Sequence, residues 1–310
     1  MRTYTDPFTH IGRQSAVALG FFDGLHIGHE KVIGSAVDAA GKDGLVAAVW
    51  TFSESPRNAF SQHSIPVITD TDEKKRIMRE LGVDVLINAP FTEQVRALTP
   101  ERFVNDVICG CMKAKRVFCG YNYSFGDGGK GDPKLLRSLC RERGISVSVI
   151  PQVCADGLPV SSTRLREMIT DGNVRGAMPL LGRPFSIYTV VISGKKIGRT
   201  IGFPTLNQVF RPGMLIPRDG VYLTRVIARG KRYFGMTDIG CKPTVGGIYR
   251  AAETHIFGFE GDLYGEKVRV EFLEFMRPEV RFESVELLRA QIQSDAERAR
   301  SMIESGDFGL

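Results

Sequence analysis

The sequence predicts an α/β protein in two parts, a doubly wound parallel sheet followed by a small antiparallel β-barrel with a closing α-helix. Three observations support this prediction. Strand-like and helix-like segments alternate up to residue 150, β-branched and aromatic runs separated by Gly, Pro and Asp turns follow residue 184, and an amphipathic helical pattern ends the chain. A chain of 310 residues with 43% hydrophobic residues can bury a core in each part.

The first part repeats a strand-helix-strand pattern. Apolar, strand-like runs occupy residues 15–19, 45–52, 83–88, 116–119 and 146–150. Helical patterns lie between them, at residues 29–40, 72–81, 100–109 and 133–143. Repeated units of this kind predict a parallel sheet covered by helices on both faces, with the ligand site at the carboxyl ends of the strands.

The composition changes after Gly182-Arg183-Pro184. Runs rich in β-branched and aromatic residues recur at 185–192, 221–228, 233–236, 254–259 and 268–275. They predict the barrel, and the apolar spacing over 284–303 predicts a closing helix with Ser284 as its N-cap. We therefore expect one domain over residues 1–182 and a second over 183–310.

The composition also narrows the class of partner. No apolar run approaches the length of a membrane span, and the six cysteines show no paired framework, so we expect a cytoplasmic protein with reduced thiols. The net charge of +6 is spread along the chain, without a long basic run or interleaved aromatic residues. We expect small phosphorylated substrates, no nucleic acid and no membrane partner, and the oligomeric state stays open, a homo-oligomer included.

The first candidate site runs from Gly20 to His29, between a predicted strand and a predicted helix. Gly24 and Gly28 leave room for a phosphate close to the backbone, and the helix N-terminus adds N–H donors. His26 and His29, three residues apart, share one face, where imidazoles suit the charge that builds on an α-phosphate as pyrophosphate leaves. Two histidines that merely satisfy a turn would not need the flanking glycines. This turn indicates nucleotidyl transfer to some acceptor.

The turn resembles the His-x-Gly-His nucleotidyltransferase superfamily, which has a Rossmann-like fold. With Phe22 and Asp23 ahead of the histidines, it resembles the bacterial bifunctional riboflavin kinase/FAD synthetases. That resemblance implies that His26 and His29 are catalytic residues. It assigns ATP binding to Gly20, Phe22, Asp23, Gly24, His26, Gly28 and His29.

Two later segments extend the resemblance. Residues 161–166 open a predicted helix and resemble the second ATP motif of the family, which assigns ATP binding to Ser161, Ser162, Thr163 and Arg166. Arg166 would act catalytically by holding the leaving pyrophosphate. Taken alone, a helix cap with a surface arginine explains this segment equally well. Residues 120–126 resemble the segment for FMN, with Asn122 and Phe125 as the FMN-binding residues.

The second candidate site lies at residues 194–207. Its glycines and basic residues are typical of a phosphate loop, and a rigid Phe-Pro then leads to Thr205 and Asn207. These two residues alternate on an extended chain, so both point to one side, and hard oxygen ligands of this kind suit Mg²⁺ held jointly with ATP phosphates. A Gly/Pro turn between strands explains the glycines but not the Thr-x-Asn pair.

This segment is similar to the riboflavin kinase signature, whose usual form ends Gly-Phe-Pro-Thr-Ala-Asn; Leu206 replaces the Ala and leaves both metal ligands intact. The resemblance assigns ATP binding to Gly194, Lys195, Gly198, Arg199, Gly202, Thr205 and Asn207. It assigns flavin binding to Tyr222, Glu253 and Arg277. Further matching pieces follow in order and cover nearly the whole chain, although Gly258 and Tyr188-Thr189 depart from the family pattern.

Glu253 is the expected catalytic base of the second site. Phosphorylation of the ribityl 5′-hydroxyl of riboflavin requires that hydroxyl to lose a proton, so a carboxylate must lie within reach. The adenylyl step differs, because its nucleophile is an FMN phosphate that is already an anion. That step needs positive charge and geometry more than a base.

The leading hypothesis is a bifunctional enzyme. Its barrel makes FMN from riboflavin and ATP, and its first domain then makes FAD from FMN and ATP, releasing pyrophosphate. Two alternatives stay open at this point: a nucleotidyltransferase for another phosphorylated acceptor with a regulatory barrel, and a non-catalytic module that binds flavin or nucleic acid. Incubation with riboflavin, ATP and Mg²⁺ separates the two enzyme hypotheses. Salt-sensitive binding to RNA or DNA without flavin turnover would support the non-catalytic module.

Overall fold

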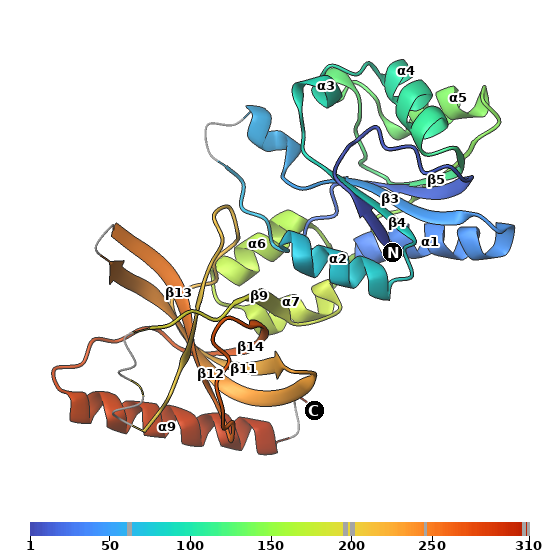
Figure 1. The fold of residues 1–310 in the computed structure, drawn as a ribbon. Helices are drawn as coiled ribbons and strands as arrows, with labels where there is room; N and C mark the ends of the chain where they lie inside the picture. The colour runs from blue at the N-terminus through green and yellow to red at the C-terminus, as the bar shows by residue number, and fades with distance from the viewer. Residues whose placement is uncertain (61–63, 195–197, 199–201, 245–246, 306–307, 309–310) are drawn as a thin grey trace. The chain divides into compact units, whose positions relative to one another are not determined.

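The computed structural model describes residues 1–60, 64–194, 198, 202–244, 247–305 and 308 (Figure 1). The chain divides into two compact units, Met1–Ser162 and Thr163–Leu310, and each is described on its own. By this division, helix α7 (Val174–Leu181) and nearly all of helix α6 (Ser162–Thr170) belong with the barrel. The predicted domain boundary between residues 182 and 183 lies just before the first barrel strand, which begins at Phe185, and it stays a prediction.

The first unit contains the predicted parallel sheet. Six strands lie in the order β1-β4-β3-β2-β5-β6, and every neighbouring pair is parallel. Their bounds are β1 (Arg2–Tyr4), β2 (Ser15–Leu19), β3 (Val46–Phe52), β4 (Val85–Ala89), β5 (Ala114–Gly120) and β6 (Ser146–Ile150). The sequence did not predict β1, because three partly exposed residues at a sheet edge make no apolar run.

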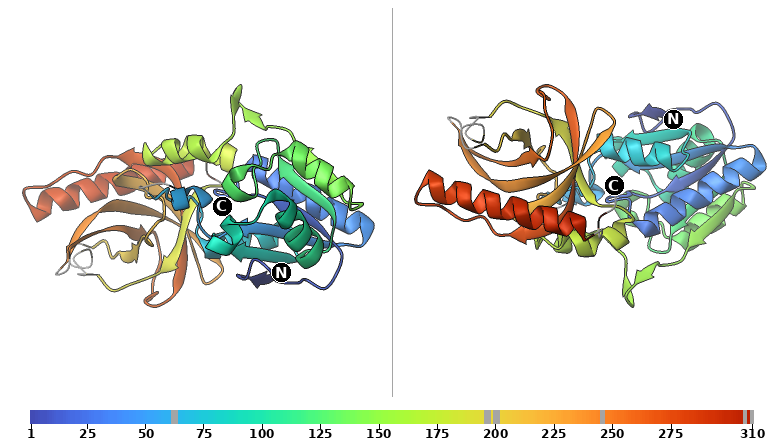
Figure 2. Two further views of the ribbon diagram at one scale, coloured as in Figure 1. Left: turned by 90° about the horizontal axis from the view of Figure 1, so that it is seen from above. Right: turned by 90° about the horizontal axis from the view of Figure 1, so that it is seen from below.

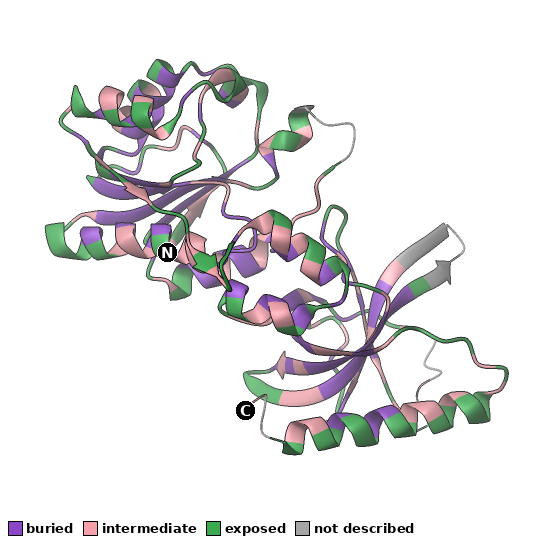
Figure 3. Ribbon diagram, turned by 180° about the vertical axis from the view of Figure 1, so that it is seen from behind, coloured by how far each residue is buried: buried purple, intermediate pink, exposed green. Residues whose placement is uncertain are grey.

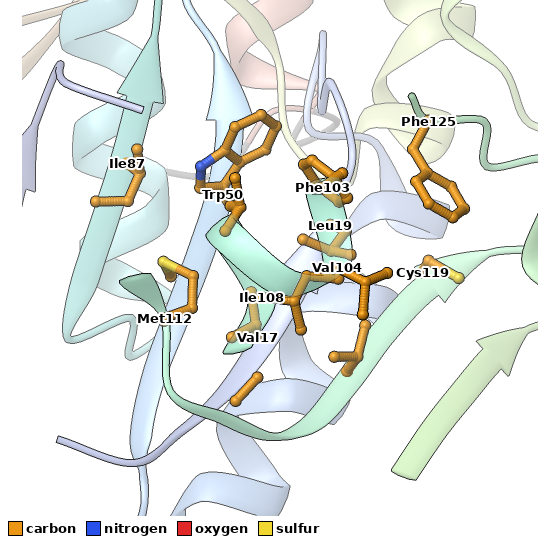
Figure 4. Close-up of a cluster of buried hydrophobic side chains, with 14 of the residues drawn as sticks. Val17, Leu19, Trp50, Ile87, Phe103, Val104, Ile108, Met112, Cys119 and Phe125 are labelled. Atoms are coloured by element: carbon orange, nitrogen blue, oxygen red, sulfur yellow. The ribbon is translucent and has the colours of Figure 1, made fainter. Parts of the chain in front are cut away.

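Helices cover both faces of this sheet, as a doubly wound fold requires. They are α1 (Ile27–Asp43), α2 (Thr71–Glu80), α3 (Glu93–Arg96), α4 (Pro100–Arg102), the π-helix η2 (Phe103–Cys111) and α5 (Pro133–Arg141), with short 3₁₀ turns η1 (Pro56–Phe60) and η3 (Asp127–Gly129). Ala18 of β2 packs with Ile33 of α1 on one face. The next residue, Leu19, packs with Ile108 of η2 on the other face (Figure 4). The helix predicted over residues 100–109 is thus mainly a π-helix.

The strand order places a topological switch at β2. β3 and β4 lie on one side of β2, whereas β5 and β6 lie on the other. The loops that leave the carboxyl ends of β2 and β5 diverge there, and open α/β sheets bind their ligands at such a point. Leu19 and Cys119, near the ends of these two strands, are paired neighbours. The fold therefore brings the turn that begins at Gly20 and the segment that begins at Gly120 to one edge of the sheet.

The second unit is an antiparallel barrel that is nearly closed. Its strands lie in the order β10-β13-β12-β11-β14-β9. Their bounds are β9 (Phe185–Val190), β10 (Leu206–Val209), β11 (Gly220–Ala228), β12 (Lys231–Thr244), β13 (Gly247–Ile256) and β14 (Lys267–Arg277). The end strands β10 and β9 are joined by the side-chain amide of Gln208, which donates to the carbonyls of Thr189 and Val268 at 2.9 and 2.8 Å.

Helix α9 (Val285–Glu304) lies along the outside of the barrel in every view (Figures 1 and 2). It begins at the predicted N-cap, Ser284, whose hydroxyl accepts the Leu287 N–H at 3.2 Å. Ala296 and Ala299 are buried and join the barrel core, while much of the helix remains exposed (Figure 3). Strand β10 and helix α7 were not predicted, because β10 has only four residues and α7 contains Pro179.

Candidate active sites

The turn between β2 and α1 has an unusual backbone. Phe22 and Leu25 have φ values of 52° and 45°, and Gly24 has a φ of 80°. Left-handed conformations cost free energy in residues other than glycine, so surrounding contacts must hold them. The Phe22 ring folds back over Gly20, where a Cβ would lie 2.8 Å from two ring carbons. Packing of Phe22 thus requires Gly20, a reason that the sequence alone did not supply.

The two predicted histidines lie together at the N-terminus of α1. His26 is the N-cap, and its Nδ1 accepts the His29 N–H at 3.3 Å. The two rings stack with their centroids 3.6 Å apart, and Phe22 meets His29 edge-on at 5.3 Å. Because Nδ1 of His26 accepts, a neutral His26 ring carries its proton on Nε2, the nitrogen that can donate to a phosphate oxygen.

Asp23 organises the turn. Its side chain is buried, and its Oδ1 accepts the backbone N–H groups of Ile68 and Thr69 at 2.8 and 3.4 Å. The carbonyl of Asp23 accepts the Ser162 hydroxyl at 2.9 Å. The first and second predicted ATP motifs are therefore in direct contact through Asp23 and Ser162. Ser161 lies beside that contact in the chain, whereas Thr163 and Arg166 belong to the other compact unit, and their predicted roles stay predictions.

A buried lysine that the sequence analysis missed also reaches this turn. Lys74 of α2 is 3% exposed, and its Nζ donates to the carbonyls of Phe21 and Phe52 at 3.3 and 3.0 Å. Burial lowers the pKa of Lys74 to about 8, although the Asp23 carboxylate opposes the shift. The sequence contained one indication that Lys74 is buried. Lys74 lies three residues before Ile77, on the buried face of an amphipathic helix.

Lys74 makes the stability of the first unit depend on pH. Between pH 8 and pH 10.5 the unfolded chain keeps a proton on Lys74 that the folded chain has lost, so stability rises with pH across this window. Below pH 8 the cost of burying the charge is present in full. Relative to Lys74→Met, the free energy of unfolding should rise by about 3 kcal/mol over the window. Urea unfolding followed by fluorescence of Trp50, the only tryptophan, measures it; a constant difference would contradict this pKa.

The segment after β5 contains both predicted FMN residues, in different surroundings. Asn122 folds back over Gly120, where a Cβ would lie 3.4 Å from its Oδ1. Phe125 is buried, and its ring packs 5.5 Å from that of Phe103 (Figure 4). The ring also lies 5.8 Å from that of Tyr123. The observed contacts of Phe125 are with the core, and FMN binding by either residue stays a prediction.

In the second unit, Thr205 and Asn207 alternate with buried neighbours. Thr205 and Asn207 are half-buried, whereas Leu206 and Gln208 are buried, so the Thr and Asn side chains share one side of the chain. Asn207 of β10 pairs with Glu253 of β13. Directly paired residues lie on the same face of a sheet. The barrel thus brings the predicted metal ligands and the predicted base together.

A third polar residue continues this row. Glu253 pairs on its other side with Asp238 of β12, which is also half-buried. The row formed by Asn207, Glu253 and Asp238 crosses three strands on one face. Sequence reasoning did not include Asp238, because only the strand register places it beside Glu253.

The glycines of the predicted phosphate loop contact these ligands. A Cβ on Gly194 would overlap the side-chain amide of Asn207, and one on Gly198 would overlap the Phe203 carbonyl and lie 3.4 Å from the Thr205 hydroxyl. Gly202 has a φ of 87°, which favours glycine. The predicted ATP-binding residues Lys195 and Arg199 lie outside the described residues.

His255 fastens the Phe-Pro segment to β13. The Pro204 carbonyl can only accept, so Nδ1 of His255 carries the proton of this 2.9 Å hydrogen bond. The Phe203 ring packs against the imidazole at 5.3 Å. Burial lowers the pKa of His255, the bond to Pro204 opposes that shift, and the nearby Arg300 guanidinium adds to it.

The two other predicted flavin residues, Tyr222 and Arg277, make hydrogen bonds within the second unit. Tyr222 is buried, its hydroxyl donates to the Arg218 carbonyl at 2.6 Å, and burial raises its pKa. The Arg277 guanidinium donates to both carboxylate oxygens of Asp295 in α9 at 2.7 to 3.0 Å, and to the Pro278 carbonyl at 3.0 Å. Flavin binding by Tyr222 and Arg277 stays a prediction.

The described residues meet neither the requirements of a metal cluster nor those of a membrane span. Among them, no group of three or more His, Cys, Asp or Glu side chains could hold a metal ion, and no helix has the length and apolar character of a membrane span. All six cysteines are free. Gly258 is exposed after β13 with a φ of 66°, which explains a glycine there. Tyr188 and Thr189 continue β9.

Two family models match the chain, one for each half. The FAD synthetase model matches residues 9–164 and the riboflavin kinase model matches residues 181–303. The stacked histidines lie in the first match, and the row of Asn207, Glu253 and Asp238 lies in the second.

Curated relatives match over nearly their full length. The bifunctional riboflavin kinase/FMN adenylyltransferase of Listeria monocytogenes is 36% identical over 96% of this chain and 94% of its own. Its counterpart from Escherichia coli K12 is 35% identical over 95% and 93%. A crystal structure described as a macrolide-efflux protein from Streptococcus pneumoniae matches with a TM-score of 0.87 at 34% identity, covering 96% of this chain and 98% of that one.

Proposed function

The chain belongs to the family of bifunctional riboflavin kinases/FMN adenylyltransferases, and we propose that its two reactions take place at two separate sites, one in each half. The barrel transfers the γ-phosphoryl group of ATP to riboflavin, giving FMN and ADP. The first half joins the phosphate of FMN to the α-phosphorus of ATP, giving FAD and pyrophosphate. The observation that carries the proposal is that the histidine pair and the Asn207–Glu253 pair lie in different compact units.

At the first site, His26 and His29 stabilise the charge that develops on the α-phosphate. The N–H groups of the 17-residue helix α1 add a positive dipole end at the same place. The FMN phosphate attacks as an anion, so no base is needed. Asn122 approaches from the neighbouring strand β5 across the topological switch, which suits an acceptor held beside ATP. We also propose that Arg166 holds the leaving pyrophosphate, as the resemblance of residues 161–166 to the second ATP motif implies.

At the second site, Glu253 accepts the proton of the ribityl 5′-hydroxyl as the γ-phosphoryl group is transferred. Its pairing with Asn207 supports this role, because Asn207 and Thr205 supply the oxygens that face the ATP phosphates. Gly194 lies against Asn207, and Gly198 lies against Thr205. The base, the ligands and these two glycines thus lie together in the second unit.

The donor set at Thr205 and Asn207 fits Mg²⁺. A hydroxyl and an amide carbonyl are hard oxygen donors, and Mg²⁺ bound with nucleotides takes its remaining ligands from phosphates and water. Bound there, the ion would neutralise phosphate charge during transfer. Thr205 and Asn207 would hold it, while Glu253 deals with the proton.

The alternatives left open by the sequence receive no support from the comparisons. A regulatory barrel would not require a match to a riboflavin kinase over residues 181–303, and the relatives are named for both activities. We further propose that the partners are small molecules, that no nucleic acid is bound, and that the protein works in the cytoplasm.

A product assay tests the proposal. Purified chain incubated with riboflavin, ATP and Mg²⁺ should form FMN and then FAD, and incubation with FMN and ATP should form FAD directly. Chromatography of the flavins measures each product. A chain that formed FAD from FMN but no FMN from riboflavin would indicate that the barrel is regulatory and not a kinase.

His255 offers a milder test of the kinase site. His255→Leu removes the hydrogen bond to Pro204, so kcat/KM for riboflavin phosphorylation should fall by up to about tenfold. His255→Asn keeps a donor close to the position of Nδ1 and should retain most of the activity. FMN adenylylation in the other unit is the internal control. Equal losses in the Leu and Asn variants would show that this hydrogen bond does not matter.

A further inference from the structure

We propose that Lys74 is a positioning residue for adenylyl transfer, which holds the backbone of the turn that carries His26 and His29. The inference rests on the proposed function of that turn. Lys74 lies on α2, outside both predicted ATP motifs, and acts through the protein rather than on the substrate.

The contacts of Lys74 join three elements. From α2, its Nζ donates to the Phe21 carbonyl just after β2 and to the Phe52 carbonyl at the end of β3. Thr51 of β3 donates its hydroxyl to the same Phe21 carbonyl at 2.7 Å. The ammonium group also lies 5.0 Å from the centre of the Phe21 ring. Two strand ends on the binding edge of the sheet are thus fixed by one side chain.

The Phe21 carbonyl leads directly to the histidines. The next residue is Phe22, whose left-handed backbone places its ring against both Gly20 and His29. Rotation of the Phe21–Phe22 peptide would move that ring and remove the edge-on support of His29. A small displacement of a group that must contact the transition state lowers the reaction rate strongly. Lys74 therefore acts on His29 through Phe21 and Phe22.

Packing alone does not explain a lysine at this position. Burying a methionine of similar length is favourable, whereas burying an ammonium group costs free energy that its hydrogen bonds must offset. The side chain is 3% exposed and lies on the helix face that also buries Ile77 and Met78. A residue chosen only to fill this space would be apolar. The positive charge instead strengthens the hydrogen bonds to the two carbonyls and attracts the buried Asp23 carboxylate nearby.

The test compares Lys74→Met with Lys75→Met. Lys75 is half-buried on the same helix, and residues one apart do not share a helix face. Lys74→Met should lower kcat/KM for FMN adenylylation by about tenfold to a hundredfold, while riboflavin phosphorylation stays unchanged. Lys75→Met should leave both reactions unchanged. Trp50 fluorescence reports whether the first unit has folded.

A double-mutant cycle with Thr51→Val separates positioning from general stability. Lys74 and Thr51 share the Phe21 carbonyl as acceptor, so the loss in the double variant should differ more than about twofold from the product of the single losses. If Lys74→Met does not fold, Thr51→Val is measured in the native chain and in Lys74→Arg, and its effect should differ between them. Equal effects in either design would overturn the proposal.

The same assays keep the two claims apart. Native chain that forms no FAD from FMN would contradict the proposed function. Native chain that forms FAD, together with a folded Lys74→Met chain that forms it equally fast, would overturn the role of Lys74 alone.

Discussion

Replacing His29 by alanine should stop FAD formation while FMN accumulates from riboflavin. His29 lies at the N-terminus of α1, stacked on His26 and supported by Phe22, where charge develops on the α-phosphate. Removing one preorganised donor at such a place lowers a rate by about 10²- to 10³-fold. Chromatography of flavins formed from riboflavin and ATP measures both products in one reaction.

His10→Ala is the matched control. His10 is exposed in the first unit, and its Nδ1 bonds to the Gly110 carbonyl at 3.2 Å. This variant should form FMN and FAD as the native chain does. Loss of FMN formation in a folded His29→Ala chain would mean that the two reactions share a site.

Glu253→Gln should have the opposite effect. Glutamine keeps the shape of the side chain and its place beside Asn207, but it cannot accept the proton of the ribityl hydroxyl. Loss of a general base lowers the rate by about 10²- to 10⁴-fold. FMN formation should fall by this amount, measured as ADP and FMN released with time, whereas FMN supplied directly should still be adenylated.

Glu260→Gln controls for the charge change. Glu260 is exposed beyond the end of β13, so its replacement should leave both rates unchanged. A Glu253→Gln chain that still phosphorylates riboflavin at the native rate would remove Glu253 from the chemistry. Asp238, its neighbour across the strand pair, would then be the next carboxylate to test.

The sequence was most informative where candidate site residues lie close together in the chain at a regular spacing. The three-residue interval between His26 and His29 and the alternation of Thr205 with Asn207 depend only on helix and strand geometry, and the structure shows both. The parallel sheet and the barrel followed from periodic apolar runs for the same reason. Short elements such as β1 and β10 were not predicted, and neither was α7, which contains a proline.

The contacts that join distant segments could not be read from the sequence. Asp238 meets Glu253 only because β12 and β13 pair in one register, and Lys74 reaches Phe21 only because α2 packs beside the ends of β2 and β3. The sequence also could not show that Phe125 is buried with its ring packed against that of Phe103. Binding of FMN by Phe125 stays a prediction.

The claim of two separate sites is tested most directly by mixing the two defective chains. His29→Ala protein supplies a kinase, Glu253→Gln protein supplies an adenylyltransferase, and neither should convert riboflavin to FAD alone. Incubated together with riboflavin, ATP and Mg²⁺, they should form FAD by way of FMN released into solution. A mixture that forms no FAD because either folded variant has lost both reactions would contradict two independent sites.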